Sequence, residues 1–393
     1  MSTGKNTIPL CIPEIRGNEW KYIKDCLDTN WVSSVGEYVN KFERSLADYV
    51  GAKYAVACIN GTAALHISLL VAGIRPGDEV IVPTLTFIAP ANAVRYVGAY
   101  PVFIDVQPDT WQLDPKQIEE FIFKGCIKYN NKLFNRKTKR IIKAILPVDI
   151  LGRPVDMEPV LALANKFKLK VIEDATESLG AAYKGKKVGS LSDLACFSFN
   201  GNKIITTGGG GMLVTNDRSY ADKARYLTTQ AKDDELEYVH NEIGYNYRLS
   251  NLQAAMGLAQ MEHLNEYIAQ KRRIAEKYYI DLGAIKGLTM PADINGSESI
   301  NWLFTILIDK RKYGLSSRQL LRELKKQGIQ SRPFWHPLHS QKPFKDCQAY
   351  NIKVANLLYR DGLSLPSSVG LQNHEQDRVI RVIRNMSKYN HEK

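Results

Sequence analysis

The chain of 393 residues lacks the cysteine pattern of a disulfide-stabilised or zinc-binding protein. Its six cysteines are scattered, and no two of them form a C-x-x-C pair. This arrangement argues against a disulfide framework and against a metal site, and it suits a reducing compartment. Residues 1–10 contain no signal-peptide core, and no apolar run approaches the length of a membrane span. We therefore expect a cytoplasmic protein with no membrane span.

Acidic residues are fewer than basic ones: 41 Asp and Glu against 53 Lys and Arg give a net charge of +12. Part of the excess gathers in one segment: Lys124, Lys128, Lys132, Arg136, Lys137, Lys139, Arg140 and Lys143. A non-catalytic protein that binds nucleic acid through this segment is a remote interpretation. No motif of a nucleic-acid-binding fold accompanies the cluster. A solvated insertion loop is therefore favoured, and we expect no nucleic-acid partner.

Apolar strands alternate with helical segments over the first half of the chain. The expected strands are 54–59, 79–83, 100–106, 141–148, 169–173, 195–199 and 210–216. This alternation predicts βαβ units and a parallel sheet, with ligands at the carboxyl ends of the strands. Asn60, Phe87, Asp174 and Lys203 all follow strands of this kind. We therefore expect these four side chains to lie at one edge of the sheet.

Helices and further strands complete the predicted organisation. An amphipathic helix over 17–29 carries Trp20, Ile23 and Leu27 on one stripe. A long helix over 251–279, rich in Ala, Met and Leu, is expected to link the domains. It is followed by the elements of a small α/β C-terminal domain: strand 302–308, helix 317–327 and strand 329–334.

The stretch 171–215 pairs an acid with a lysine about thirty residues later. A lysine amine can hold a pyridoxal aldehyde as a Schiff base, and a carboxylate such as Asp174 can keep the pyridinium nitrogen protonated. Lys203 as a solvated surface charge and Asp174 as a helix cap are the simpler interpretations. The turn Asn60-Gly61-Thr62 before a helix offers free N–H groups to an anion, although an N-capping Thr explains it about as well.

Seven motifs are specific in combination. They are VNKFE at 39–43, NGTAA at 60–64, TFIA at 86–89, PVFID at 101–105, EDA at 173–175, SFNGNK at 198–203 and GYNYRL at 244–249. Through them the sequence resembles the DegT/DnrJ/EryC1/StrS family of pyridoxal-phosphate-dependent nucleotide-sugar aminotransferases. The resemblance covers nearly the whole chain. It implies the α/β aspartate-aminotransferase fold (fold type I), with a mostly parallel seven-stranded sheet in a large domain, 1–260, and a smaller domain, 261–393.

The resemblance also implies a role for each residue that matches a family motif. Lys203 is the Schiff-base lysine and proton carrier, Asp174 pairs with the pyridinium nitrogen, and Phe87 stacks on the ring of pyridoxal 5'-phosphate. The remaining assignments are Glu177 near the phenolic oxygen, Gly61, Thr62 and Ser198 on the phosphate, Asn246 of a neighbouring subunit on the same phosphate, and Arg248 on the donor carboxylate. The partners implied are L-glutamate (leaving as 2-oxoglutarate), a nucleotide-linked keto-sugar and a second copy in a homodimer.

Each of these assignments has a structural alternative. Phe87 alone is more often a core aromatic, Ser198 an ordinary strand residue, and Arg248 a partner of a structural acid. The full constellation favours the functional interpretation. Lys203 itself favours transamination, because some relatives carry His at this position and act as sugar dehydratases.

Within the family, the resemblance is closest to enzymes that aminate C4 of a nucleotide-linked (UDP favoured) 2-acetamido-4-keto-6-deoxyhexose. These enzymes serve the synthesis of bacillosamine- or legionaminic-acid-type surface sugars. A diphosphate and a flat base require cations, hydroxyls and rings. The candidates are Ser33, Ser34, Arg332, Trp335, His336 and His339, although the two histidines suit a turn equally well. A C3 enzyme, or a C4 enzyme on a sugar without the acetamido group, is the alternative.

Overall fold

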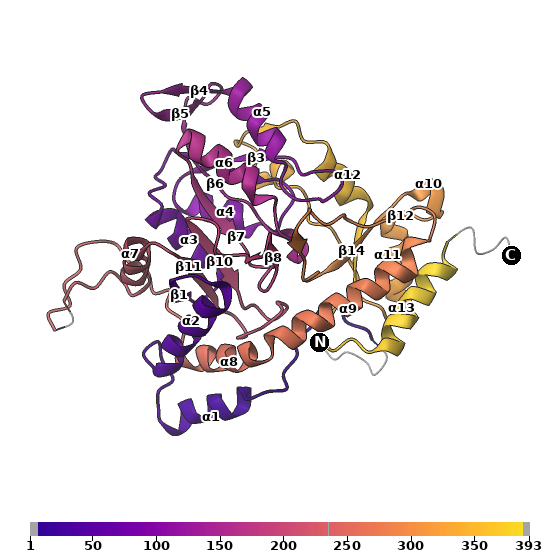
Figure 1. The fold of residues 1–393 in the computed structure, drawn as a ribbon, viewed down its shortest axis with the longest axis horizontal. Helices are drawn as coiled ribbons and strands as arrows, with labels where there is room; N and C mark the ends of the chain where they lie inside the picture. The colour runs from indigo at the N-terminus through magenta and orange to yellow at the C-terminus, as the bar shows by residue number, and fades with distance from the viewer. Residues whose placement is uncertain (1–6, 235, 388–393) are drawn as a thin grey trace.

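A ten-stranded sheet forms the centre of the chain in the computed structural model, which describes residues 7–234 and 236–387 (Figure 1). The main path runs β1 (Tyr54–Cys58), β11 (Gly211–Thr215), β10 (Leu194–Ser198), β7 (Lys170–Asp174), β6 (Ile141–Ile145), β2 (Glu79–Pro83), β3 (Tyr100–Ile104), β16 (Ala349–Tyr350). Only β11 is antiparallel to its neighbours on this path. The first seven strands are the expected seven-stranded, mostly parallel sheet.

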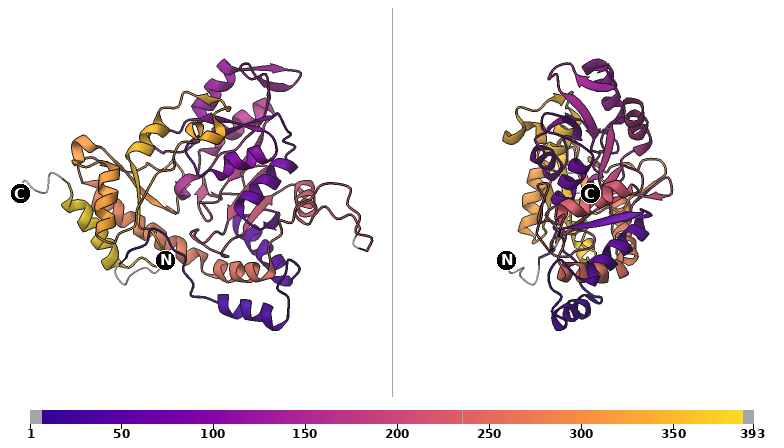
Figure 2. Two further views of the ribbon diagram at one scale, coloured as in Figure 1. Left: turned by 180° about the vertical axis from the view of Figure 1, so that it is seen from behind. Right: turned by 90° about the vertical axis from the view of Figure 1, so that its left-hand side faces the viewer.

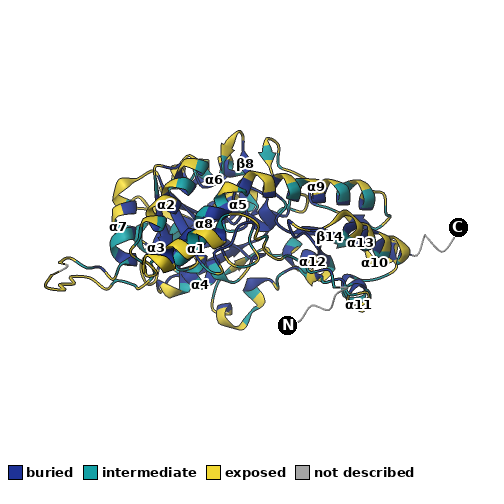
Figure 3. Cartoon of the chain, turned by 90° about the horizontal axis from the view of Figure 1, so that it is seen from below, coloured by how far each residue is buried: buried dark blue, intermediate teal, exposed yellow. Residues whose placement is uncertain are grey.

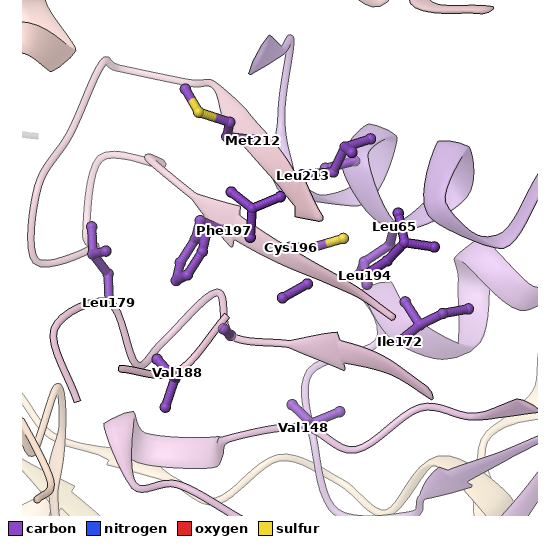
Figure 4. Close-up of a cluster of buried hydrophobic side chains, with 14 of the residues drawn as sticks. Leu65, Val148, Ile172, Leu179, Val188, Leu194, Cys196, Phe197, Met212 and Leu213 are labelled. Atoms are coloured by element: carbon purple, nitrogen blue, oxygen red, sulfur yellow. The ribbon is translucent and has the colours of Figure 1, made fainter. Parts of the chain in front are cut away.

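The strands are apolar on both faces because helices cover both. Along β2, Val80 and Val82 point into one hydrophobic cluster and Ile81 into another, as alternating side chains must. The helices of this domain are α1 (Glu19–Asp28), α2 (Glu37–Val50), α3 (Gly61–Val71), α4 (Ala89–Tyr96), α5 (Pro115–Gly125), α6 (Met157–Phe167), α7 (Arg218–Thr228) and α8 (Asn251–Glu262). Figure 4 shows Leu65 of α3 beside Cys196 and Leu194 of β10.

A second hydrophobic cluster lies in a smaller α/β unit. Its sheet follows the order β12 (Leu288–Thr289), β14 (Phe304–Ile308), β17 (Gly362–Leu365), β15 (Arg332–Pro333). Its helices are α9 (Leu264–Gly283), α10 (Lys310–Tyr313), α11 (Ser317–Lys326), α12 (Val354–Asp361) and α13 (Asn373–Asn385). Short elements β8 (Ala182–Tyr183), β9 (Lys186–Lys187) and β13 (Ser297–Glu298) form a third sheet that joins the two parts.

The expected domain boundary at 260 stays a prediction, and residues 1–6 and 388–393 of the two expected domains lie outside the described chain. The expected helix over 251–279 is wrong in one respect: it breaks at His263, whose φ of −108° and ψ of 3° end α8 and begin α9. The apolar pattern continues through this single residue, so periodicity does not reveal the break. The expected strand over 329–334 reduces to β15, and Ile329 forms only an isolated bridge with Ile8.

The stripe expected on the first helix faces solvent. Trp20 is 78% exposed and Leu27 is also exposed, whereas Glu19 and Cys26 are the buried residues of α1. Figure 3 shows buried residues gathered on the inner faces of the helices and much of α1 exposed. Helical periodicity correctly identified the helix, and its apolar stripe lies on the outer side.

The basic segment 124–143 is an ordered hairpin, not the expected insertion loop. β4 (Cys126–Tyr129) pairs with β5 (Lys132–Asn135), and β5 pairs with the start of β6. The turn residues Asn130 and Asn131 have φ values of 44° and 57°, which Asn tolerates in tight hairpin turns. The hairpin projects from the body at the top of Figure 1.

A buried carboxylate joins the two parts of the molecule. Asp105, just after β3, is 1% exposed and accepts from the main-chain N–H groups of Lys353, Val354 (2.7 Å) and Ala355 (2.8 Å), at the start of α12. It therefore caps a helix that follows it by about 250 residues and satisfies donors that would otherwise be buried without partners.

We expect Asp105→Asn to lower the free energy of unfolding by about 2 kcal/mol, because an amide NH₂ replaces one acceptor oxygen in front of these donors. Urea denaturation of parent and variant measures the change. Asp309→Asn is the matched control, since Asp309 caps the short helix α10 at an exposed position. Equal losses in the two variants would contradict the interpretation.

Candidate active site

A cavity of about 490 Å³ opens at the carboxyl ends of the parallel strands, between the two parts of the chain. Eight of the predicted site residues line it: Gly61, Thr62, Phe87, Glu177, Ser198, Lys203, Arg332 and Trp335. The first six come from the ends of strands in the large sheet, whereas Arg332 and Trp335 come from β15 and the segment after it. The topology therefore places the expected residues at one edge of the sheet, as predicted.

Lys203 lies in the loop after β10, and its side chain is only 12% exposed. Its main-chain N–H donates to the carbonyl of Asn200 (2.9 Å). Its Nζ lies 3.6 Å from Glu177 Oε1 and 4.2 Å from the centre of the Trp302 ring. Lys203 is thus enclosed between a carboxylate and an aromatic face. The simpler interpretation of Lys203 as a solvated surface charge is therefore wrong.

Asp174 is the last residue of β7 and is buried beneath the cavity. Its Oδ1 accepts from the N–H of Thr176 (3.1 Å). Burial raises the pKa of this carboxyl, and the charge of Lys203 opposes that shift. Asp174 and Lys203 are the acid and the amine that were predicted to act together from the stretch 171–215.

The start of α3 lies on the cavity wall. Asn60 caps the helix by accepting from the N–H of Ala63 (2.8 Å). Gly61 and Thr62, in the first turn, line the cavity, and first-turn N–H groups have no acceptor within a helix. A side chain on Gly61 would meet Ser198 Cβ at 2.9 Å, so glycine is what lets the Ser198 hydroxyl approach this turn.

The four glycines at 208–211 were expected to let the backbone pass near Lys203, and Gly209 and Gly210 line the same cavity as that lysine. In addition, a Cβ on Gly211 would lie 2.4 Å from the carbonyl carbon of Asn60, so the bare backbone packs against the start of α3. Gly210 has φ +99°, a value that favours glycine, and its N–H donates to the carbonyl of Ile59 (2.8 Å).

Three further buried acids lie close to Asp174, and one of them, Glu177, lines the cavity. Burial raises the pKa of Glu177 to about 7, although Lys203 and a hydrogen bond from Leu151 N–H (2.8 Å) act against it. Glu173 and Asp149 are fully buried neighbours whose pKa values burial also raises, in the case of Glu173 to about 7. Glu173 Oε1 has no hydrogen-bond partner, which favours a protonated carboxyl in this pair.

Besides Asp174 and the two histidines, four predicted site residues do not line the cavity of this single chain: Ser33, Ser34, Asn246 and Arg248. The two serines belong to the exposed link between α1 and α2, where the Ser33 carbonyl accepts from Asn251 N–H (2.6 Å). Asn246 is exposed, and Arg248 Nε is buried without a partner. Their assigned roles stay predictions.

The two histidines make local contacts. His339 Nδ1 shares a hydrogen bond with Thr84 Oγ1 (2.8 Å), and burial lowers its pKa. His336 Nδ1 shares one with Ser340 Oγ (3.1 Å), and its ring meets Tyr359 edge to face. Neither lines the cavity, so these contacts suit the turn interpretation, and a substrate-binding role stays a prediction.

Sequence reasoning missed several residues of the cavity. Trp302, 4% exposed, faces Lys203 but was assigned only to the beginning of a strand. Cys11 and Asn202 also line the cavity. No sequence pattern distinguishes a tryptophan that faces a lysine from one in a core, so only the packing of the two domains reveals it.

These residues suit the cofactor that the resemblance implies. A phosphate needs N–H donors and hydroxyls at a helix start, a pyridine ring needs a flat partner, and its nitrogen needs a buried acid. The first need is met by Gly61, Thr62 and Ser198, the second by Phe87, whose ring is 55% exposed on the cavity wall, and the third by Asp174. No cluster of metal-ligating side chains occurs within residues 7–234 and 236–387.

The model of the DegT/DnrJ/EryC1/StrS aminotransferase family matches residues 13–384. The chain belongs to this family. The protein is therefore a pyridoxal-phosphate-dependent sugar aminotransferase, and the expected family, fold class and cofactor are confirmed. None of the helices within the described part of the chain is both long and apolar enough to span a bilayer.

Three similar proteins illustrate the relationship. A GDP-perosamine synthase of Caulobacter vibrioides is 43% identical over 96% of this chain and 97% of its own. A UDP-2-acetamido-2-deoxy-3-oxo-D-glucuronate aminotransferase of Pseudomonas aeruginosa is 35% identical over 89% and 92%. The crystal structure of a DegT/DnrJ/EryC1/StrS aminotransferase from Brucella abortus superposes with a TM-score of 0.85 at 31% identity, over 94% of this chain and 95% of that one.

We expect Glu177→Gln to gain stability relative to the parent as the pH rises from 5 to 8. The folded chain holds the Glu177 proton more tightly, with a pKa of about 7, than the unfolded chain, where Glu titrates near about 4.3. The stability contributed by this carboxyl is therefore complete below the lower value and is lost as the pH rises through the higher one.

Urea unfolding of the cofactor-free proteins at both pH values measures this change, which we expect to be about 2 kcal/mol. Glu119→Gln, at an exposed position of α5, is the control. If the free energies of unfolding of Glu177→Gln and parent differed by the same amount at both pH values, Glu177 would be ionised throughout.

Proposed function

We propose that this protein transfers the amino group of L-glutamate to C4 of a nucleotide-linked 4-keto-6-deoxyhexose. The observation that supports it best is the position of Lys203 Nζ, inside the cavity and 3.6 Å from Glu177 Oε1. An enclosed amine at the ends of parallel strands, beside a helix start that can hold a phosphate, is what a transaminase needs.

The proposed cofactor contacts follow from the lining of the cavity. Gly61, Thr62 and Ser198 hold the phosphate, Phe87 covers one face of the ring, and Asp174 lies at its nitrogen. When bound, pyridoxal phosphate supplies an electron sink that acidifies the carbon next to the reacting amine. Glu177 is assigned to the phenolic oxygen, which its raised pKa permits because a protonated carboxyl can donate.

Lys203 is the proposed proton carrier. As a free amine, its Nζ takes a proton from Cα of the donor in the first half-reaction and returns a proton to C4 of the sugar in the second. Glu177 and Trp302 hold Nζ on opposite sides, so its motion is confined to the path between these positions. Arg248 is proposed for the donor carboxylate.

The nucleotide sugar is proposed to enter past Arg332 and Trp335, which supply a cation and a ring at the cavity rim. Ser33, Ser34, His336 and His339 remain candidates for its outer contacts. The relative named GDP-perosamine synthase supports a GDP-linked sugar, whereas the motifs quoted from the sequence favour a UDP-linked 2-acetamido sugar of the bacillosamine or legionaminic-acid type. For either nucleotide we propose the cytoplasmic synthesis of surface sugars as the setting of the reaction.

Amination at C3 is the second candidate. It is supported by the Pseudomonas relative, whose name describes a 3-oxo sugar acid. The Pseudomonas relative is 35% identical to this chain, whereas the perosamine synthase is 43% identical, so amination at C3 is the weaker candidate.

A homodimer with shared active sites is supported by exposed apolar side chains. The segment after α7 projects from the body, as Figure 2 shows, and ends at Asn246. Leu236 is 89% and Ile243 is 85% exposed on it. Large apolar side chains at this exposure favour a partner surface. We propose that a second copy covers them and brings Asn246 to the phosphate of the partner site.

Lys203→Ala is expected to abolish both half-reactions, because no other amine in the described cavity lining replaces it. Glutamate should bleach the yellow colour of the parent but should not change the spectrum of the variant. Lys168→Ala, on the surface after α6, is the control for general effects. Full transaminase activity of Lys203→Ala would contradict the proposal.

Incubation with each candidate sugar tests the substrate. We expect product NMR to show a new amine at C4 with a GDP-linked or UDP-linked 4-keto-6-deoxyhexose, and no amine at C3 with a 3-keto sugar. Comparison of kcat/KM between the GDP and UDP compounds identifies the nucleotide. An amine at C3 overturns the assignment of the position.

Mixing two inactive variants tests the shared site. Lys203→Ala and Asn246→Ala dimers that exchange subunits should regain activity, because each mixed dimer contains one site with both residues intact. Random exchange restores about a quarter of the parent activity. No recovery after confirmed exchange contradicts a site shared in this way.

A further inference from the structure

Trp302 contacts Lys203 and the peptide just before it. The centre of the indole ring lies 4.2 Å from Lys203 Nζ. The indole Nε1 donates to the carbonyl of Asn202 (2.7 Å). The same carbonyl accepts from Cys11 Sγ (3.2 Å). The chain entering Lys203 is therefore held by two side chains from outside its own loop.

Lys271 holds Trp302 from the opposite side. It lies on α9, is 1% exposed, and its Nζ donates to the carbonyl of Trp302 (2.6 Å) and to that of Ser367. Its third neighbour is Cys11 Sγ at 3.6 Å. A buried ammonium is costly unless its donors are used, so these acceptors fix both the lysine and the carbonyl of Trp302.

The backbone before Trp302 is also constrained. Asn301 has φ +51°, and its side-chain oxygen accepts from Arg153 Nη1 (2.8 Å). A Cβ on Gly152 would lie 2.7 Å from the nitrogen of Trp302 and 2.8 Å from the carbonyl oxygen of Glu177. The backbones of Trp302 and Glu177 thus pack against the same glycine, which fixes the two neighbours of Lys203 Nζ relative to each other.

We propose that Trp302 is a positioning residue for Lys203 and that the buried ammonium of Lys271 holds Trp302 in that position. The inference rests on the proposed role of Lys203 as the proton carrier. The ring face confines and covers Nζ, while the indole N–H fixes the peptide from which the side chain extends. Lys271 transmits the position of α9, in the smaller unit, to the reacting amine of the larger one.

Two variants separate these contacts. Trp302→Phe keeps a ring and removes the N–H that binds Asn202. Lys271→Met keeps the length of the side chain and removes the donor to the Trp302 carbonyl. The matched controls are Trp20→Phe, at an exposed tryptophan of α1, and Lys277→Met, at a lysine of the same helix α9 that pairs with Asp281 and Asp377.

The first readout is independent of turnover. Cofactor-free protein is treated with an acetylating N-hydroxysuccinimide ester, and the acetylation of Lys203 relative to Lys128 is measured by mass spectrometry. We expect about fivefold faster acetylation of Lys203 in Trp302→Phe and in Lys271→Met, because loss of one hydrogen bond frees the side chain. The two controls should match the parent.

The second readout is the loaded enzyme. We expect kcat of the glutamate half-reaction to fall about tenfold in both variants with less change in KM, because the lost contact orients the amine and does not bind substrate. Should Trp302→Phe not fold, Trp302→Tyr, which also lacks the indole N–H, repeats both measurements.

Acetylation of Lys203 at the parent rate in both variants overturns the proposal. A loss of stability with an unchanged acetylation rate also overturns it, because a purely structural role predicts that combination. Failure of the proposed function gives a different pattern. In that case Lys203→Ala remains active, whatever the acetylation rates of the Trp302 and Lys271 variants.

Discussion

The pairing of β10 with β7 on one side and β11 on the other is the constraint on which the site depends. Parallel pairing aligns Cys196 with Asp174, so the acid at the end of β7 lies beside the strand that leads to Lys203. Antiparallel pairing brings Gly211 opposite both Ser198 and Cys58. The start of α3, the Ser198 hydroxyl at the end of β10 and the buried Asp174 therefore lie close together because the four strands β1, β11, β10 and β7 are paired in fixed register.

This register also concentrates buried charge, which the fold stabilises in different ways. Burial raises the pKa of Asp174 and the charge of Lys203 opposes that shift, whereas burial raises the pKa of Glu173 to about 7 and, together with the charge of Glu173, raises the pKa of Asp149. The raised pKa values favour the protonated form of these carboxyls and so reduce the negative charge near the cavity. Had all three carboxyls been ionised, their mutual repulsion would oppose both folding and the selective pairing of one of them with a cationic ring.

Much of this was accessible from the sequence, and the remainder has physical reasons. The seven central strands, the placement of Asp174 and Lys203, and the helix start at Gly61 follow from apolar periodicity and local turn chemistry. The exposed side of α1 does not, because periodicity identifies an apolar face without saying what covers it. Trp302 and Lys271 were missed because their roles arise from contacts between distant segments, such as the 2.6 Å bond from Lys271 Nζ to the Trp302 carbonyl. The pairing of strands within residues 124–143 was not predicted, because the many lysines and arginines of this segment obscure the alternation of apolar and polar residues that is typical of a strand.

The capping of α12 by Asp105 has a mechanical consequence. The smaller unit is attached to the larger at several points besides the covalent chain: the carboxylate under α12, the pairing of β16 with β3 and the third sheet formed by β8, β9 and β13. A hinge motion that opened the cavity would have to break buried hydrogen bonds at all of them. These contacts therefore oppose a hinge motion between the two units.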